Sequence, residues 1–192
     1  PMPIKTLSEQ GYKMPAEWEP HRATWLAWPH NPETWPGKVR KIPPIWLQMI
    51  KPLHLHEEVH ILVNDAVTEA QARLTLRRWD IESNIFFHQI PTDDCWMRDA
   101  GPIFVKNVGA PLGAPLALVK SKFNKWGEKY PPWEVDDAIP GRVNEALKLP
   151  FFETGIVLEG GSIDVNGCGT LLTTEQCLLN KNRNPHLKRE EI

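Results

Sequence analysis

The fold is decided by the stretch "DAGPIFVKN" at residues 99–107, because a related stretch, "EGGSIDVNG", occurs at residues 159–167. Each stretch begins with a carboxylate, Asp99 or Glu159, followed by glycine two places later, isoleucine four places later and valine six places later. The two carboxylates are 60 residues apart (159 minus 99). A fixed spacing of this kind is typical of a repeat architecture.

The elements around the first stretch indicate what the repeating unit is. They are expected to be strands at residues 102–107 and 114–121, a helix at 141–149 and a strand at 151–159. The unit is therefore β-β-α-β, and about three such units fit in 192 residues. Residues 108–113 are expected to form a loop, and residues 122–140, which show no period, a long surface loop. In the second hairpin, Asn166-Gly167 predicts a type I′ turn.

The first half of the chain has a strand–helix–strand pattern typical of a βαβ unit. The expected elements are a short strand within residues 25–29, a helix from residue 43 or 44 to 56, strands at 58–63 and 84–90, and a helix at 64–79. The helix at 64–79 begins with an Asn-Asp capping pair and ends with basic residues, as the helix dipole favours. The chain is therefore predicted to be α/β throughout.

Composition excludes several classes of function. The formal net charge is −2, so no basic field would recruit nucleic acid. No apolar stretch reaches the roughly 18 residues of a membrane span, and no apolar signal segment opens the chain. Three cysteines, Cys95, Cys168 and Cys177, are too few for a disulfide framework and favour a reducing compartment. A cytoplasmic location is therefore expected.

The repeat also predicts a site. Equivalent residues of a closed array meet at its axis, so Asp99 and Glu159 are expected to lie together, with glycines that allow close approach of the backbone. Two carboxylates in one pocket repel each other and need a cation. A guanidinium fits best, because its planar fork binds carboxylates in bidentate fashion. Trp96 is expected in the pocket wall, where its ring offers a cation–π contact.

Other interpretations remain open from the residues alone. Asp99 can instead pair with Arg98, and the Glu159 carboxylate can accept backbone N–H groups from the glycines that follow it. A divalent metal also binds carboxylates, but no histidine stands with these two. The stretch "HLHEEVH" supplies His54, His56 and His60, which straddle a helix end and a strand start, so no metal site is expected there.

Three blocks of the sequence carry a family resemblance: "GYKMPAEWEPHRATWLAWP", "DCWMRDAGP" and "LEGGSIDVNGCGTLLTTEQCLLNKNRNP". They resemble the agmatine deiminase family, also called the Porphyromonas-type peptidylarginine deiminase family. The resemblance implies a five-bladed α/β propeller of ββαβ modules and hydrolysis of agmatine to N-carbamoylputrescine and ammonia through a cysteine nucleophile, without a cofactor. It implies that Asp99 binds the guanidinium, that Glu159 supports the substrate and the catalytic histidine, and that Trp96 lines the substrate pocket.

The chain departs from the family pattern in one respect. The His-x-Asp segment and the Gly-rich segment with the nucleophilic cysteine do not occur within residues 1–192. These residues are therefore expected to be the N-terminal part of one deiminase domain, with about three of five blades, and to be inactive alone. The expected partner is a small guanidino substrate, with a homo-oligomer possible. The alternatives are deimination of free or peptidyl arginine and a non-catalytic guanidine-binding module.

Overall fold

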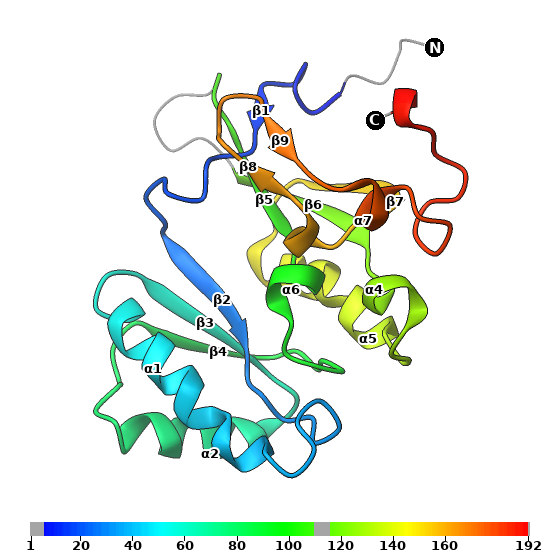
Figure 1. Ribbon diagram of the computed structural model, residues 1–192. Coiled ribbons are helices and arrows are strands. Elements are labelled where there is room, and N and C mark those ends of the chain that lie inside the picture. The colour runs from blue at the N-terminus through cyan, green and yellow to red at the C-terminus, as the bar shows by residue number, and fades with distance from the viewer. Residues whose placement is uncertain (1–5, 110–115, 192) are drawn as a thin grey trace. The chain divides into compact units, whose positions relative to one another are not determined.

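The computed structural model describes residues 6–109 and 116–191, which form two compact units (Figure 1). One unit comprises residues 20–97, and the other combines the N-terminal segment up to residue 19 with the chain from residue 98 onward. The carboxylates of the predicted site both belong to the second unit. Each unit is described by itself.

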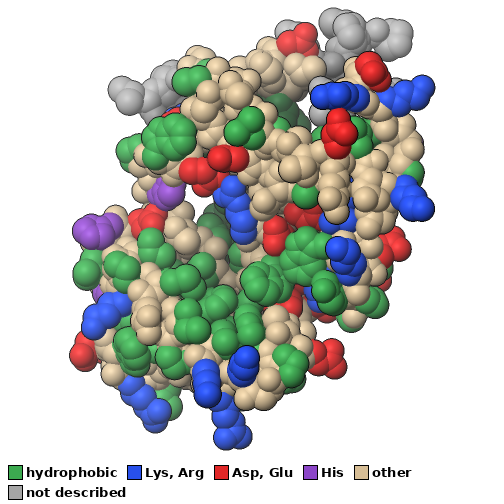
Figure 2. All heavy atoms as spheres, viewed as in Figure 1, with side chains coloured by type: hydrophobic (Ala, Val, Ile, Leu, Met, Phe, Trp, Pro, Cys, Tyr) green, Lys and Arg blue, Asp and Glu red, His purple; other side chains and the backbone are tan. Residues whose placement is uncertain are grey.

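The unit of residues 20–97 contains a parallel sheet with strand order β2-β3-β4. Its elements are β2 (Ala23–Ala27), η1 (Val39–Lys41), α1 (Pro43–Leu53), β3 (Glu58–Val63), α2 (Ala66–Arg77) and β4 (Ile85–Gln89). The strand–helix–strand prediction is confirmed, and Asp65 caps α2 by accepting from the Thr68 N–H. Alternate residues of β3 pack against apolar residues of α1 and α2 to form the core. Figure 2 shows further hydrophobic side chains at the surface of this unit. Ile45 and Met49 of α1 are among the exposed hydrophobic residues.

The second unit contains the predicted β-β-α-β module. Its sheet has strand order β1-β5-β6-β7, from β1 (Tyr12–Lys13), β5 (Ile103–Asn107), β6 (Leu116–Lys122) and β7 (Phe151–Val157). Strands β5 and β6 form an antiparallel pair, and α6 (Ile139–Leu147) leads from β6 to its parallel neighbour β7. The described part of the predicted loop at 108–113 ends at residue 109, and residues 110–113 lie outside the described residues, as do the first two of the strand predicted at 114–121.

The next module begins after β7. It opens with the 3-10 turn η2 (Gly160–Ser162) and the antiparallel hairpin of β8 (Asp164–Val165) and β9 (Leu171–Leu172), followed by α7 (Glu175–Leu178) and η3 (Arg189–Glu191). The hairpin is confirmed, but the two-residue type I′ turn is wrong, since five residues separate the strands. The Asn166 side chain instead accepts the N–H groups of Cys168 and Thr170, which organises a longer loop.

The predicted surface loop at residues 122–140 is also wrong. It contains the one-turn helices α4 (Lys125–Glu128) and α5 (Glu134–Asp137), and α6 begins within it. Phe123, Asn124 and Asp136 are buried there. The segment lacks a helical period because each element is a single turn, and its order comes from contacts with distant parts of the chain.

Candidate functional site

Asp99 lies in α3 (Met97–Ala100), a single helical turn directly before β5. Its Oδ1 accepts a hydrogen bond of 3.2 Å from the N–H of Gly161 in η2. A Cβ at Gly161 would overlap this carboxylate, and a Cβ at Gly160 would overlap the carbonyl oxygen of Arg98. The two halves of the sequence repeat therefore meet directly, and the glycine pair makes this approach possible.

The Asp99 carboxylate is half-buried, and burial raises its pKa. Hydrogen bonds from the Gly161 N–H and from the Trp126 side chain oppose this shift, as does the charge of Arg98. Arg98 is engaged elsewhere: its guanidinium lies 2.7 Å from Glu17 Oε1 and donates to the Ile163 carbonyl at 3.3 Å. Among residues 6–109 and 116–191, no ion pair includes Asp99.

Glu159 is more deeply placed, with 2% of its surface exposed. Its Oε1 accepts from Arg183 Nε at 2.7 Å, and the Arg183 side chain is itself only 8% exposed. Ser162 donates to the Glu159 backbone carbonyl through both its N–H and its hydroxyl. The carboxylate is thus held by a protein guanidinium, a contact of the kind that the sequence predicted for a ligand.

Arg183 was missed as a site residue, although it lies in the Asn-Arg-Asn-Pro block. An arginine inside the polar run of residues 180–184 gives no local sign of a partner 24 positions away. The available signal was electrostatic. A buried glutamate needs a cation as its partner, and Arg183 is a basic residue 24 positions further along the chain.

Trp126 was also missed, because it lies in the segment predicted as a surface loop. It occupies α4, where Lys125, Trp126, Gly127 and Glu128 all have positive φ angles of 46°, 59°, 84° and 63°. A Cβ at Gly127 would overlap the side chains of Asn182 and Arg183. This turn therefore packs against the segment whose Arg183 binds Glu159.

Trp96 belongs to the unit of residues 20–97 and is 37% exposed. Its ring centroid lies 6.0 Å from that of Trp35, which in turn packs edge-on against Trp46 at 6.1 Å. The Trp46 indole donates to the Ala27 carbonyl at the end of β2. This aromatic stack fixes Trp96 within its own unit, and its place in the wall of the carboxylate pocket stays a prediction.

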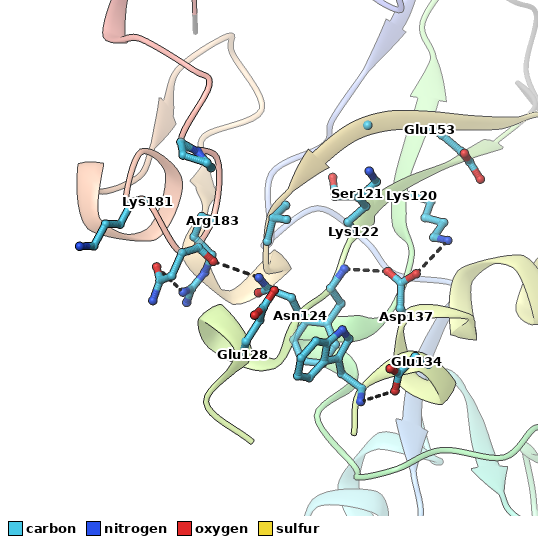
Figure 3. Close-up of a pocket in the computed structure, with 16 residues that line it drawn as sticks. Lys120, Ser121, Lys122, Asn124, Glu128, Glu134, Asp137, Glu153, Lys181 and Arg183 are labelled. Carbon is cyan, nitrogen blue, oxygen red and sulfur yellow. Dashed lines mark hydrogen bonds and ion pairs between the residues drawn. The ribbon is translucent and has the colours of Figure 1, made fainter. Parts of the chain in front are cut away.

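A cavity of about 580 Å³ lies in the second unit, on β6, β7, α4, α5 and the segment 181–185 (Figure 3). Its walls carry four basic side chains and four acidic ones: Lys120, Lys122, Lys181, Arg183, Glu128, Glu134, Asp137 and Glu153. The charges partly cancel, for example in the Lys120–Asp137 pair at 3.3 Å. Asp99 and Glu159 do not line it, but Arg183, which binds Glu159, does.

The histidines of "HLHEEVH" are not brought together as metal ligands. The ring of buried His54 lies within hydrogen-bond distance of the Ser83 hydroxyl (3.2 Å), and His56 is exposed. His60 stacks on Trp25 and shares a hydrogen bond of 2.8 Å with His88. In the described part of the chain, no three His, Cys, Asp or Glu side chains are grouped as a metal site would require. Within the same residues, no helix is long and apolar enough to cross a membrane.

Comparison with known proteins identifies similar sequences and folds. Residues 13–192 match the model of the family described as Porphyromonas-type peptidyl-arginine deiminase. The agmatine deiminase of Ectopseudomonas mendocina is 42% identical over 193 residues, covering 97% of this chain and 50% of that protein. The chain therefore spans about half the length of the curated relatives it matches.

Two solved structures share the fold. Agmatine deiminase of Enterococcus faecalis, captured catalysing its reaction, has a TM-score of 0.86 and 31% identity, over 99% of this chain and 51% of that one. A cysteine-to-serine variant of Campylobacter jejuni agmatine deiminase with substrate bound has a TM-score of 0.79 and 27% identity, over 94% and 50%. The predicted fold class, a partial α/β propeller of ββαβ modules, is confirmed by this likeness and by the three sheets.

Proposed function

The chain belongs to the Porphyromonas-type peptidyl-arginine deiminase family, and on this basis we propose that the protein hydrolyses the guanidinium of agmatine to N-carbamoylputrescine and ammonia. The curated relatives and the solved neighbours named as agmatine deiminases support this substrate over others. The proposal concerns the whole protein, of which these residues supply the carboxylates.

The observation that carries the proposal is that Asp99 is a carboxylate that takes part in no ion pair of the described residues. This half-buried carboxylate accepts a hydrogen bond from the Gly161 N–H, yet it forms no ion pair with the residues that the structure describes. A partly desolvated carboxylate is stabilised by a cation with several donors, and a guanidinium offers two parallel N–H groups to it. Asp99 is therefore assigned to grip the substrate.

The other predicted residues take supporting roles. Glu159, whose charge is neutralised by Arg183, is assigned to support the substrate and the catalytic histidine. Trp96 is assigned to the pocket wall. Each role stays a prediction, as do a cytoplasmic location and a homo-oligomeric state.

The reaction proceeds in two balanced steps. A cysteine thiolate attacks the guanidinium carbon, the bond from that carbon to one terminal nitrogen breaks, and the nitrogen leaves with a proton as ammonia. Water then attacks the same carbon, its two protons pass to the catalytic histidine and to the released ammonia, the C–S bond breaks, and the ureido product leaves as the thiolate is restored. The carboxylates hold the carbon against the thiolate, and no metal or organic cofactor takes part.

The nucleophile is assigned to residues outside 1–192. Neither Cys168, which is exposed in the β8–β9 loop, nor Cys177, which lies in α7, is assigned a chemical role. Cys95 is buried in the unit of residues 20–97. The 192-residue chain is expected to give no ureido product by itself, and ureido product formed by the chain alone would contradict this assignment.

The first test is deimination by the full-length protein. Ammonia release from agmatine is measured for the unmodified protein and for Asp99→Ala, whose kcat/KM is expected to fall by at least about 10³-fold, because the loss removes both charge and orientation. Asp164→Ala serves as the matched control, since Asp164 is an exposed aspartate of the equivalent β8 strand. Near-normal turnover in Asp99→Ala would overturn the assignment of Asp99.

The same assay decides between the substrates. Free arginine and an arginine-containing peptide are compared with agmatine at equal concentration. A higher kcat/KM for either of them would replace agmatine deimination by arginine deimination. Binding of agmatine without turnover by the full-length protein would instead favour a non-catalytic guanidine-binding module.

A further inference from the structure

We propose that Thr34 is a positioning residue for Trp96: its hydroxyl holds the Asp94 carboxylate, and this contact sets the turn from which the Trp96 indole is presented to the substrate. The inference rests on the proposed function, in which Trp96 lines the substrate pocket, and it adds a residue to which the sequence assigned no role. Its evidence is a set of contacts around residues 92–97, all within the unit of residues 20–97.

The segment that carries Trp96 leaves the parallel sheet from a fixed point. Strands β2, β3 and β4 all end at the same edge of their sheet, the edge at which open parallel sheets bind ligands. The Asn64 side chain accepts the N–H of buried Thr92 at 3.1 Å and donates to the Thr92 carbonyl at 3.0 Å. His30 Nε2 lies 3.1 Å from the same carbonyl. The chain therefore leaves β4 in one direction.

The loop after β2 holds the next two residues of the segment. The Asn31 amide donates to the Asp93 carbonyl at 3.1 Å, and the Thr34 hydroxyl donates to Asp94 Oδ2 at 2.5 Å. Asp94 is only 6% exposed, so its carboxylate needs hydrogen-bond donors from the protein. A bond from a hydroxyl to a carboxylate is about twice as strong as one between neutral groups. Thr34 therefore fixes one oxygen of this carboxylate.

The other oxygen of Asp94 acts on the backbone that follows. Asp94 Oδ1 accepts the Cys95 N–H at 2.8 Å, and the Cys95 carbonyl accepts the Met97 N–H at 2.9 Å. The second of these bonds closes a tight three-residue turn with Trp96 at its centre. Both backbone polar groups of Cys95 are thus engaged, and the turn that carries Trp96 starts from the carboxylate that Thr34 holds.

The Trp96 ring is held in place and is still accessible. Its centroid lies 6.0 Å from that of Trp35, with an angle of 40° between the ring planes. Trp35 is the neighbour of Thr34 in the chain, so the same loop contacts both the ring and the turn that carries it. Trp96 is nevertheless 37% exposed. A fixed indole with an accessible surface suits a cation–π contact with a guanidinium.

The test compares KM and kcat for agmatine in full-length Thr34→Val, which keeps the shape of the side chain but lacks the hydroxyl. A cation–π contact binds the cationic substrate before and during the reaction, so its loss raises KM and spares kcat. We expect KM to rise by about 5- to 10-fold, with kcat within about twofold of the unmodified protein. Thr34→Ser restores the hydroxyl and should restore KM.

Thr24→Val is the matched control. The Thr24 hydroxyl donates to the Glu57 carboxylate at 3.0 Å, so the same chemical change removes the same kind of bond elsewhere in the same unit. This variant should leave KM unchanged. An unchanged KM in Thr34→Val, an equal rise in Thr24→Val, or a failure of serine to restore KM would overturn the proposal.

A double variant shows whether Thr34 acts through Trp96. Trp96→Ala should itself raise KM, and Thr34→Val should then have no further effect in that background. Equal effects of Thr34→Val with and without the indole would overturn the proposal. If Thr34→Val does not fold, Trp96→Ala still decides, because an unchanged KM in this variant of an exposed residue would refute a role for Thr34 through Trp96.

The last measurement needs no activity. In full-length protein labelled with 5-fluorotryptophan, the fluorine resonance of Trp96 is identified by its loss in Trp96→Phe. It should shift in Thr34→Val and stay in place in Thr34→Ser and Thr24→Val, and an unmoved resonance in Thr34→Val would refute the contact. If the unmodified protein deiminates no guanidino compound while the resonance responds as expected, the proposed function fails and the positioning of Trp96 by Thr34 stands.

Discussion

Asp99 and Glu159 hold equivalent positions in the sequence repeat, yet the structure places them in opposite environments. Glu159 is buried and bound at 2.7 Å by the guanidinium of Arg183. Asp99 is half-buried, its pKa is raised by burial, and it accepts a hydrogen bond from the neutral Gly161 N–H, while the charge of the neighbouring Arg98 lowers this pKa. Pairs of titratable groups with diverging environments are typical of sites that divide two roles between two acids.

The difference indicates which of the two carboxylates can still bind a cation. The charge of Glu159 is satisfied within the chain, so this residue stabilises the fold as well as the site. No ion pair of the described residues includes Asp99, and for this reason we propose that it binds a cationic ligand. The Arg183–Glu159 pair is also an internal example of the contact that Asp99 is proposed to make with substrate.

The largest expected effect comes from breaking the internal pair. Arg183→Met leaves the Glu159 carboxylate buried without its cation, which should lower the free energy of unfolding by about 3–5 kcal/mol. Urea unfolding measures this change. Arg73→Met, which breaks the Glu69–Arg73 pair of α2, is the control and should cost about 0.5 kcal/mol or less because Arg73 is 48% exposed.

A double variant separates the loss of the cation from the loss of packing. Glu159→Gln combined with Arg183→Met should recover much of the loss, since no buried charge remains unpaired. If Arg183→Met unfolds at the same urea concentration as the unmodified protein, Glu159 is not held by Arg183 and the contrast with Asp99 disappears.

The features predicted from sequence and those missed differ in the range of the interactions that create them. Strand β3 and helix α2 follow from periodicity and capping, which are local, and the meeting of residues 99 and 159 follows from the repeat. Turn α4 leaves no period because it is left-handed and one turn long. Arg183 contacts Glu159 across the tertiary fold, so no local pattern assigns it.

The second prediction concerns Gly161, which follows Glu159 by two residues and donates its N–H to Asp99. Gly161→Ala places a Cβ where Asp99 Oδ1 lies, so the carboxylate must move. We expect kcat/KM for agmatine to fall by about 10²-fold, because a displacement of about 1 Å at a substrate-orienting group costs that much. Ammonia release by the full-length protein measures the change.

Gly141→Ala is the matched control. Gly141 lies in α6, and no atom is within 4 Å of the position of its Cβ. Alanine there should leave activity unchanged and stabilise the helix by about 0.5–1 kcal/mol. Full activity in Gly161→Ala would show that Asp99 does not need its present position.

The smallest effect is also the most direct comparison, because the same chemical change is made at both carboxylates. Burial raises the pKa of Asp99, so the folded protein favours the neutral acid, and ionisation costs stability as pH rises through the folded pKa. Asp99→Asn should therefore raise the melting temperature at pH 7 by on the order of 1–2 °C, while agmatine turnover is lost. The gain should vanish below about pH 4, where aspartate is protonated even in the unfolded chain.

Glu159→Gln should instead lower the melting temperature at pH 7, because it removes the partner of a buried guanidinium. If the melting temperatures of both variants shift in the same direction, the two carboxylates have equivalent environments. That result would contradict the proposal that Asp99 binds a cationic ligand.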